Sequence, residues 1–255
     1  MRKLIEGIVQ FRRDVRPGYR ETFARLALGQ APDSLFIACS DSRVVPNLFA
    51  SSDPGDLFVV RCLGNLVAPA ATPAASIAAA IEYAVGKLRV GDIIVCGHSS
   101  CGAMASLLEA APADPELPQL NRWLRHGQPA LARLRGGGAL DASLPEVDQL
   151  GQLNVLSQME NVQSYPVVAD AVASGRLGVH GFFFDIQQAE VHAYEPELGR
   201  FTLIDEAEAS RLIPRMHDRR LRREPGPRAH SLTSSAKGAA PTVRRSEARA
   251  RRPTR

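Results

Sequence analysis

The chain has 255 residues, 45% of them hydrophobic and 23% charged, so it can bury a full core in one large α/β domain or two small ones. No apolar run approaches the roughly 20 residues of a membrane span, and the first residues lack the apolar stretch and cleavage site of a secretory signal. The formal net charge of +4 conceals +11 on residues 211–255 and therefore −7 on residues 1–210, which argues against a nucleic-acid-binding surface on the body.

The first predicted element is a helical arm. Apolar residues spaced between Leu4 and Leu28 indicate two helical stretches over residues 2–28, with a break at Pro17-Gly18. The arm precedes the first strand and has no sheet face of its own to cover. We therefore expect it to pack on a second subunit.

An α/β pattern follows the arm. Strands are predicted at 34–39, about 57–61, about 92–96 and 179–186, with a short edge strand at 190–194; helices are predicted at 73–88, from Gly102 onward, at 119–135 and at 146–174 (broken at Pro166), and a loop at 111–118. The Ala-rich helix at 73–88, which opens with Thr72-Pro73, is typical of a crossover between parallel strands. The predicted fold class is α/β: a central, mostly parallel sheet of four strands plus an edge strand, flanked by helices, with an N-terminal helical arm.

The C-terminal segment differs in composition from the rest. From about residue 216 the chain contains Arg-rich runs, Pro225-Gly226-Pro227 and few apolar residues, which predicts disorder. We therefore place a folded domain at 1–215 and a basic tail at 216–255. Such a tail is suited to weak contacts with anionic partners, for example nucleic acid, anionic lipid or an acidic protein.

Two motifs at the ends of predicted strands carry the chemistry. Cys39-Ser40-Asp41-Ser42-Arg43 lies at the end of the first strand, and His98-Ser99-Ser100-Cys101 follows the third. Two thiolates and an imidazole are ligands that Zn²⁺ prefers, and three protein ligands leave one tetrahedral position for water, as in catalytic sites. Ligands in open α/β sheets also bind at the carboxyl ends of strands. Asp41 is either the fourth ligand or the group that handles the bound water.

These residues also have a purely structural interpretation. The two cysteines would then be small buried hydrophobic residues, and Asp41 and Arg43 would form a surface ion pair. The repeated pattern of a strand followed by a ligand favours a metal centre with one Zn²⁺ per chain. Cys62 and Cys96 are interpreted as packed thiols. Four cysteines without an extracellular context favour metal binding over disulfides, and therefore a cytoplasmic protein.

With these motifs the chain resembles the β-class carbonic anhydrases over roughly residues 1–205, and most closely the bacterial branch associated with cyanate metabolism. Further segments in the family's order are Phe58-Val59-Val60-Arg61 with Gly64-Asn65, Ile81-Glu82-Tyr83-Ala84-Val85, Asn154-Val155 and His180-Gly181. The resemblance implies a carbonate dehydratase that hydrates CO₂ reversibly to bicarbonate and a proton. Zinc lowers the pKa of a bound water toward about 7, an effect for which carbonic anhydrase is itself the standard example, and the resulting hydroxide attacks CO₂.

The resemblance also assigns roles to residues. Zn²⁺ would be held by Cys39, His98 and Cys101. Arg43 would hold Asp41 ionised, so that its carboxylate accepts the proton of the zinc-bound hydroxide; with Arg43 turned away, Asp41 would become a fourth ligand and close the site. Gln30, Phe58 and Tyr83 match residues that bind substrate. Because a neighbouring subunit supplies part of this lining in the family, the minimal active unit would be a homodimer, alone or in a tetramer made of two dimers.

Some family members carry a regulatory bicarbonate site built from a Trp, an Arg and a Tyr. The matching residues here are Phe36, Arg61 and Phe184, so we expect this site to be absent and Arg61 to be structural or to link subunits. Two other functions remain open. One is hydration of CS₂ or COS at the same zinc site, and the other is a binding protein whose basic tail provides the contact.

Overall fold

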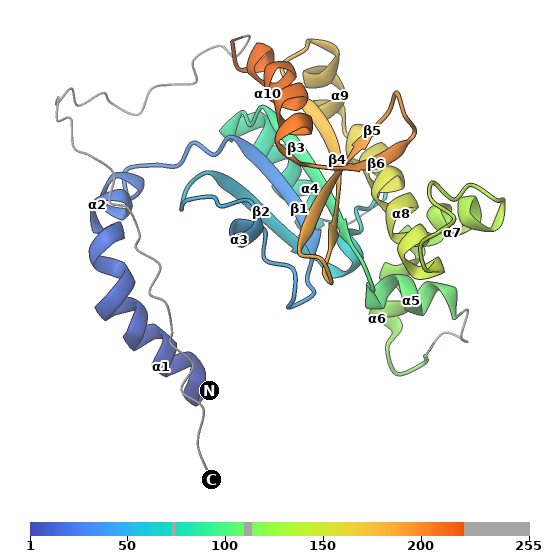
Figure 1. Ribbon diagram of the computed structural model, residues 1–255, viewed down its shortest axis with the longest axis horizontal. Helices are drawn as coiled ribbons and strands as arrows, with labels where there is room; N and C mark the ends of the chain where they lie inside the picture. Colours follow the sequence, from blue (N-terminus) through green and yellow to red (C-terminus); the bar gives the residue numbers. More distant parts are fainter. Residues whose placement is uncertain (73–74, 110–113, 222–255) are drawn as a thin grey trace.

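The computed structural model describes residues 1–72, 75–109 and 114–221, in which helices pack on a central sheet (Figure 1). The helical elements are α1 (Arg2–Gln10), η1 (Phe11–Val15), α2 (Arg16–Leu26), α3 (Pro46–Phe49), η2 (Leu63–Asn65), α4 (Ala75–Glu82), η3 (Tyr83–Leu88), α5 (Gly102–Leu108), α6 (Pro118–Leu124), η4 (Arg125–Gly127), α7 (Gln128–Arg135), α8 (Glu146–Gln163), α9 (Pro166–Ala173) and α10 (Glu206–Leu221). The strands are β1 (Ser34–Cys39), β2 (Leu57–Cys62), β3 (Asp92–His98), β4 (Gly178–Asp185), β5 (Glu190–Glu195) and β6 (Arg200–Leu203).

The six strands form one sheet in the order β2-β1-β3-β4-β5-β6. The first four strands run parallel, and β5 and β6 are antiparallel to their neighbours. The predicted α/β class and mostly parallel sheet are therefore confirmed, with one strand more than expected. The strand β6 was not predicted because it has only four residues, two of which are polar. As a result β6, and not β5, lies at the edge of the sheet.

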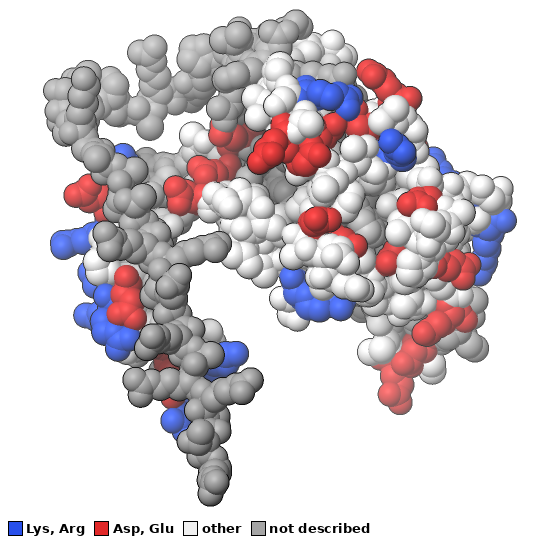
Figure 2. Space-filling view, in the orientation of Figure 1, with Lys and Arg blue, Asp and Glu red and all other residues white. Residues whose placement is uncertain are grey.

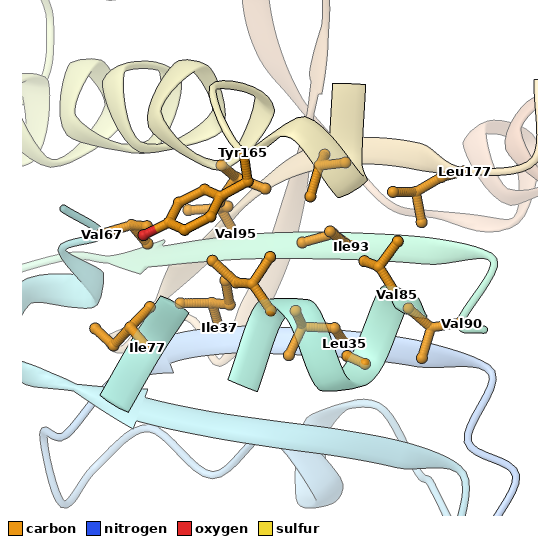
Figure 3. Close-up of a cluster of buried hydrophobic side chains, with 14 of the residues drawn as sticks. Leu35, Ile37, Val67, Ile77, Val85, Val90, Ile93, Val95, Tyr165 and Leu177 are labelled. Carbon is orange, nitrogen blue, oxygen red and sulfur yellow. The ribbon is translucent and has the colours of Figure 1, made fainter. Parts of the chain in front are cut away.

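The central strands form because their side chains are buried on both faces, which is typical of parallel strands. Leu35 and Ile37 of β1 point toward α4 and α9, where they join Ile93 and Val95 of β3 in the main core (Figure 3). Phe36 of β1 belongs to a separate cluster on the opposite face. Continuous apolar runs thus place both β1 and β3 in the middle of the sheet, with their carboxyl ends side by side.

A second buried cluster lies beyond the carboxyl ends of these strands. It contains Leu66, Met104, Leu150 and Leu153, together with two cysteines of the predicted metal centre. Helices α5, α7 and α8 contact one another around it. The predicted ligands therefore lie among apolar side chains, at the carboxyl ends of β1 and β3.

The N-terminal arm is helical throughout, and the predicted break at Pro17-Gly18 is wrong. The irregularity lies just before the proline, in the π-helical segment η1. Proline has no N–H to donate and its ring crowds the preceding turn, and the wider π-helical turn accommodates this without ending the helix. Figure 1 shows the arm extending away from the body of the protein.

The other predicted helices are present with different bounds or divisions, whereas α3 and α10 were not predicted. The predicted helix at 119–135 is divided into α6, η4 and α7, because Pro129 begins a new helix in the first turn of α7. The break at Pro166 is confirmed as the boundary between α8 and α9. The start predicted at Thr72-Pro73 and the loop predicted at 111–118 fall partly outside the described residues, at 73 and at 111–113. Pro118, the last residue of that loop, already begins α6.

The boundary predicted at 215/216 falls inside a helix. Helix α10 continues to Leu221 and so spans this boundary, and residues 222–255 of the predicted tail lie outside the described residues. On the face shown in Figure 2, acidic and basic side chains of the body are interspersed. Among the residues that the structure describes, no helix is both long and apolar enough to cross a membrane.

Candidate metal centre

The two motifs meet because β1 and β3 are adjacent parallel strands. Cys39 is the last residue of β1 and His98 the last of β3, and the ladder between the two strands pairs Ala38 with Cys96. Carboxyl ends of parallel strands lie at the same edge of a sheet, as the sequence predicts. Cys101 follows β3 by three residues and directly precedes α5.

Cys39, His98 and Cys101 form a compact group of potential ligands. Their two Sγ atoms and one imidazole nitrogen all lie within 4.8 Å of one another, and each residue is at most 2% exposed. The Nε2 atom of His98 is buried and has no hydrogen-bond partner. A buried nitrogen without a partner is costly unless something binds it. Two sulfur atoms and one nitrogen in this arrangement fit a metal ion such as Zn²⁺.

A second contact of His98 determines which nitrogen is available. Its Nδ1 lies 2.9 Å from the carbonyl oxygen of Ser99. A carbonyl can only accept, so Nδ1 carries the proton and donates it. In the neutral imidazole, Nε2 is then unprotonated and presents its lone pair toward the two thiols. A backbone carbonyl thus orients the ring as a ligand.

The surroundings of Cys39 favour its thiolate. Its pKa is lowered, chiefly by a hydrogen bond from the Cys101 thiol and further by the N–H groups of Asp41 and Gly64, while burial works against the shift. The Gly64 N–H donates to Cys39 Sγ at 3.2 Å. The hydrogen bond shared with Cys39, together with burial, raises the pKa of Cys101. A divalent cation between the sulfur atoms would stabilise both as thiolates.

Asp41 and Arg43 form a bidentate ion pair beside this group. Arg43 Nε donates to Oδ1 of Asp41 at 3.0 Å and Nη2 to Oδ2 at 2.8 Å, and the Arg43 backbone N–H also donates to Oδ1 at 2.9 Å. These bonds lower the pKa of Asp41, the side-chain bond from Arg43 contributing most, so the carboxylate stays ionised. Oδ2 lies 4.0 Å from Nε2 of His98. Arg43 also donates to the Ser100 carbonyl at 3.1 Å, which connects the two motifs.

Arg61 supports the loop that follows β1. Its Nε donates to the carbonyl of Cys39 at 2.6 Å and its Nη2 to that of Asp41 at 2.7 Å. Within the described residues, Arg61 therefore has the structural role that was one of the two expectations. Phe36 and Phe184, the other two positions matched to the regulatory site, are buried in an apolar cluster in which Phe184 stacks on Phe49 with ring centroids 4.7 Å apart.

Bicarbonate is expected to inhibit this protein only as a product. Neither aromatic ring offers a hydrogen-bond donor to an anion, and Arg61 already donates to two backbone carbonyls. Initial-rate measurements of CO₂ hydration at increasing bicarbonate should give hyperbolic inhibition. A sigmoidal inhibition curve, or an anion bound between Phe36 and Arg61 in a crystal, would contradict this expectation.

Asp148 positions the second motif and was not among the predicted site residues. Ser100 has a left-handed backbone conformation with φ of 54°, and its N–H donates to Oδ1 of Asp148 at 2.6 Å. Asp148 lies in the first turn of α8 and is only 8% exposed. The sequence shows an acidic residue in the first turn of a predicted helix. The attraction between a carboxylate and the helix dipole is enough to explain an acidic residue at that position. No sequence signal connected it to Ser100.

A row of amides on α8 holds the turn beside Cys39. Asn154 Nδ2 donates to the Gly64 carbonyl at 2.9 Å, Gln158 Oε1 accepts from the Val67 N–H at 2.9 Å, and Asn161 Nδ2 donates to the Val67 carbonyl at 2.8 Å. The helical spacing of these amides puts them on one buried face. They fix the turn whose Gly64 N–H reaches the sulfur of Cys39.

The predicted substrate-binding residues lie away from the metal group of their own chain. Gln30 is exposed in the loop before β1, and Phe58 is near the start of β2, so both are at the opposite end of their strands from the carboxyl-terminal edge. Tyr83 is 45% exposed and contacts Phe58, with ring centroids 5.9 Å apart. The structure therefore brings Phe58 and Tyr83 together, but it does not bring them to Cys39.

The other two cysteines are packed thiols, as predicted. Burial is the main cause that raises the pKa of Cys62 and of Cys96, each to about 12. His180 pairs with Asp92 through Nε2 and Oδ1 at 2.8 Å. This contact lies at the start of β3, far along the strand from the metal group.

Comparisons with known proteins place this geometry in a family. A carbonic anhydrase family model matches residues 34–191. The carbonic anhydrase of Pseudomonas aeruginosa is 41% identical over 206 residues, covering 81% of this chain and 93% of that protein, and carbonic anhydrase 1 of Escherichia coli O157:H7 is 37% identical, covering 79% and 91%. The solved β-carbonic anhydrase CcaA is 37% identical with a TM-score of 0.75, covering 81% and 92%.

A second solved structure, one of two tetrameric β-carbonic anhydrases from Sordaria macrospora, is 32% identical with a TM-score of 0.65, covering 80% of this chain and 95% of that one. The matched family residues include both motifs and the strands that position them. The similarity in sequence, in fold and in the Cys-His-Cys group leads to one conclusion: the chain belongs to the β-carbonic anhydrases, enzymes that hydrate CO₂ reversibly.

Proposed function

We propose that this chain catalyses the reversible hydration of CO₂ with one Zn²⁺ per chain, held by Cys39, His98 and Cys101. The observation that carries the proposal is the buried, unpartnered Nε2 of His98 facing two thiols, with an ionised aspartate beside it. When bound, zinc supplies a Lewis acid that makes a coordinated water acidic enough to act as a nucleophile near neutral pH. The chain's own residues then have to orient that water, receive its proton and admit CO₂.

Asp41 is proposed as the proton acceptor at this position. Oδ1 already accepts two hydrogen bonds from Arg43, whereas Oδ2 accepts one. Oδ2 therefore keeps a lone pair for a proton, and it is the oxygen that lies 4.0 Å from Nε2 of His98. Because Arg43 fixes the carboxylate in direction, the acceptor is oriented before substrate arrives.

We propose a closed state in which Asp41 is itself the fourth ligand. This would require Arg43 to give up its bonds to both carboxylate oxygens and to the Ser100 carbonyl. In this structure the Asp41–Arg43 pair is formed, so Arg43 fixes the orientation of the carboxylate. Arg43 is thus proposed to control access to the metal as well as the charge of Asp41.

Gln30, Phe58 and Tyr83 are proposed to bind substrate at the metal centre of a second copy of the chain. From Ser34 to Cys39, β1 spans about 16 Å at roughly 3.3 Å per residue, so residues before it cannot reach the metal group at its far end. A symmetric dimer can place the start of these strands in one copy near their end in the other. The homodimer is then the minimal active unit, as such or within a tetramer.

The N-terminal arm supports this assembly. No residue of α1, η1 or α2 is buried. Several of these residues are apolar, and Leu4, Ile8, Phe11 and Phe23 are each at least 43% exposed. Fully burying a side chain of this kind contributes about 1.5–3 kcal/mol. Packing on a second copy of the chain removes this apolar surface from water and so stabilises the arm. We propose that the arm packs in this way.

Substituting Ile8→Asp is expected to weaken the dimer, because a carboxylate replaces an apolar contact at the interface. Sedimentation velocity should show a shift toward monomers at micromolar protein, with zinc content unchanged because all three ligands come from one chain. Gln10→Asp adds the same charge to the same helix at a polar, exposed position and should assemble like the unmodified protein. A monomeric unmodified protein with full activity would contradict the proposed assembly.

The activity is tested by stopped-flow CO₂ hydration on protein whose zinc content has been measured. We expect activity that rises in proportion to zinc up to one ion per chain, and that a chelator removes and added zinc restores. Parallel assays with COS and CS₂ test the other heterocumulenes. Zinc-loaded protein that fails to hydrate CO₂ would overturn the proposal.

We propose that residues 1–215 hold the catalytic machinery and that the basic segment after them is dispensable for it. The four cysteines are all free thiols, which supports a reducing compartment, and we propose the cytoplasm. Contact of the basic segment with an anionic partner is proposed as a separate, weak function. Its support is charge alone.

Truncation after Leu221, where α10 ends, is expected to leave CO₂ hydration and oligomer mass unchanged. Residues 222–255 carry ten Lys and Arg against Glu224 and Glu247, so the truncation changes the formal net charge from +4 to −4. Adsorption to heparin or to anionic vesicles should weaken, most clearly at low salt, where screening is least. Loss of activity or dissociation to monomers would show that this segment is structural.

A further inference from the structure

A third thiol lies beside the proposed metal centre. Cys62 ends β2 as Cys39 ends β1, and the two residues are Cα partners in the parallel ladder. The Ser40 N–H donates to the Cys62 carbonyl at 3.1 Å, so the pairing holds to the end of both strands. We propose that Cys39 and Cys62 form a reversible disulfide when a hydroperoxide oxidises the centre, and that the metal is released as a result.

The geometry of the pair suits this bond. Side chains of paired residues on neighbouring parallel strands point to the same face, and the strands are about 4.8 Å apart. This separation falls within the roughly 4.4–6.8 Å between Cα atoms that a disulfide spans. Both sulfur atoms also contact the same turn: Cys39 Sγ accepts from the Gly64 N–H at 3.2 Å, and Cys62 Sγ donates to the Leu66 carbonyl at 3.2 Å.

Cys62 and Cys96 are the two thiols outside the proposed ligand group, and only Cys62 is a strand partner of Cys39. The group of three ligands does not include Cys62, and its Sγ instead donates to the Leu66 carbonyl at 3.2 Å. Cys101 is also close to Cys39 but is itself a ligand. Cys96 belongs to the cluster on the opposite face of the sheet, so it cannot meet Cys39 without a rearrangement of β3.

The chemistry balances with hydrogen peroxide as the oxidant. The Cys39 thiolate attacks one peroxide oxygen, the O–O bond breaks, and Cys39 sulfenic acid and hydroxide form. The Cys62 thiol then attacks the sulfenic sulfur; the S–S bond forms and water leaves with the Cys62 proton. The two sulfurs together lose two electrons, which reduce the peroxide. Loss of the Cys39 thiolate leaves only His98 and Cys101 as ligands, so the metal dissociates.

The experiment uses the full-length, zinc-loaded protein treated with hydrogen peroxide. Zinc release is followed with a chromophoric chelator, free thiols are alkylated, and unreduced tryptic peptides are identified by mass. Cleavage separates the thiols into peptides 26–43 with Cys39, 62–87 with Cys62, and 90–122 with Cys96 and Cys101. We expect a 26–43/62–87 pair that lacks two hydrogens, in step with zinc loss. Dithiothreitol with added zinc should restore the zinc content.

Two variants sharpen the test. Cys62→Ser should lose zinc to peroxide without forming the linked pair, and Cys39 should then oxidise to sulfinic or sulfonic acid, which dithiothreitol does not reverse. Cys96→Ser removes a buried thiol from the other face and should behave like the unmodified protein. A 26–43/90–122 pair in the unmodified protein, or full zinc recovery by oxidised Cys62→Ser, would overturn the proposal. If Cys62→Ser does not load zinc, the peptide map of the unmodified protein still decides.

The inference rests on the proposed metal centre, but it can fail separately. Zinc content and CO₂ hydration of the same sample before oxidation test the centre and the activity. The peptide map tests only the partner of Cys39. An untreated protein with full zinc and activity but without the 39–62 disulfide after oxidation would refute the inference alone.

Discussion

Replacing Cys101 by serine is expected to remove most of the bound zinc and, with it, CO₂ hydration. A serine hydroxyl does not ionise near neutral pH, so the substitution removes one of two negative ligands and leaves Cys39 and His98 in a buried site. Elemental analysis should show a fall from about one zinc per chain to a small fraction of that value, and stopped-flow assays should show a matching loss of activity.

Cys96→Ser is the matched control for this prediction. Cys96 is a fully buried thiol of β3, two residues before His98, but it belongs to the cluster on the opposite face of the sheet. This variant should keep its zinc, although burying a hydroxyl there can cost about 1–3 kcal/mol of folding free energy. Full zinc retention by Cys101→Ser would show that Cys101 is only a packed thiol.

Asp41→Asn is expected to lower kcat/KM by about 10²-fold or more while zinc remains bound, since removing a positioned proton acceptor has effects of this size. The amide keeps the size of the side chain but cannot accept the proton, and it loses the charge that pairs with Arg43. Because Arg43 lowers the pKa of Asp41, the carboxylate is ionised throughout the neutral and alkaline range. The deficit should therefore persist from pH 7 upward.

Asp141→Asn provides the control for the loss of one carboxylate. Asp141 also accepts the backbone N–H two residues further on, from Ser143 at 3.0 Å, as Asp41 does from Arg43 at 2.9 Å. It lies in an exposed loop and should have no effect on activity. If Asp41→Asn hydrates CO₂ at nearly the unmodified rate, Asp41 is only a partner of Arg43. If it loses zinc, Asp41 contributes to metal binding instead.

The sequence by itself determined the chemistry and the class of fold. The grouping of Cys39, His98 and Cys101 could be predicted because two thiols and an imidazole that follow apolar strands are a typical set of metal ligands, and parallel strands place such ends together. The crossover helix and the continuous apolar strands were sufficient to predict a mostly parallel sheet. The Asp41–Arg43 ion pair could be predicted because two side chains that are two residues apart in a turn can contact each other.

Local details of backbone were less predictable. Proline usually indicates a break in a helix. At Pro17 the helix continues, because the preceding segment is π-helical, whereas Pro129 lies in the first turn of a new helix. The residue type is the same in both cases, and the outcome depends on whether the preceding turn can widen. β6 was missed for a related reason: its pairing with β5, and not its own pattern, makes it a strand.

Only the tertiary structure decided which residues hold the site in place and which predicted residues lie far from it. Asp148 reaches Ser100 across forty-eight positions of the chain, and the pairing of Cys62 with Cys39 depends on strand order. The same strand geometry separates Gln30 from the metal group, although the sequence places them nine residues apart. An extended strand carries its two ends far apart while adjacent strands bring distant residues within a few ångströms, so proximity along the chain does not measure proximity in the fold.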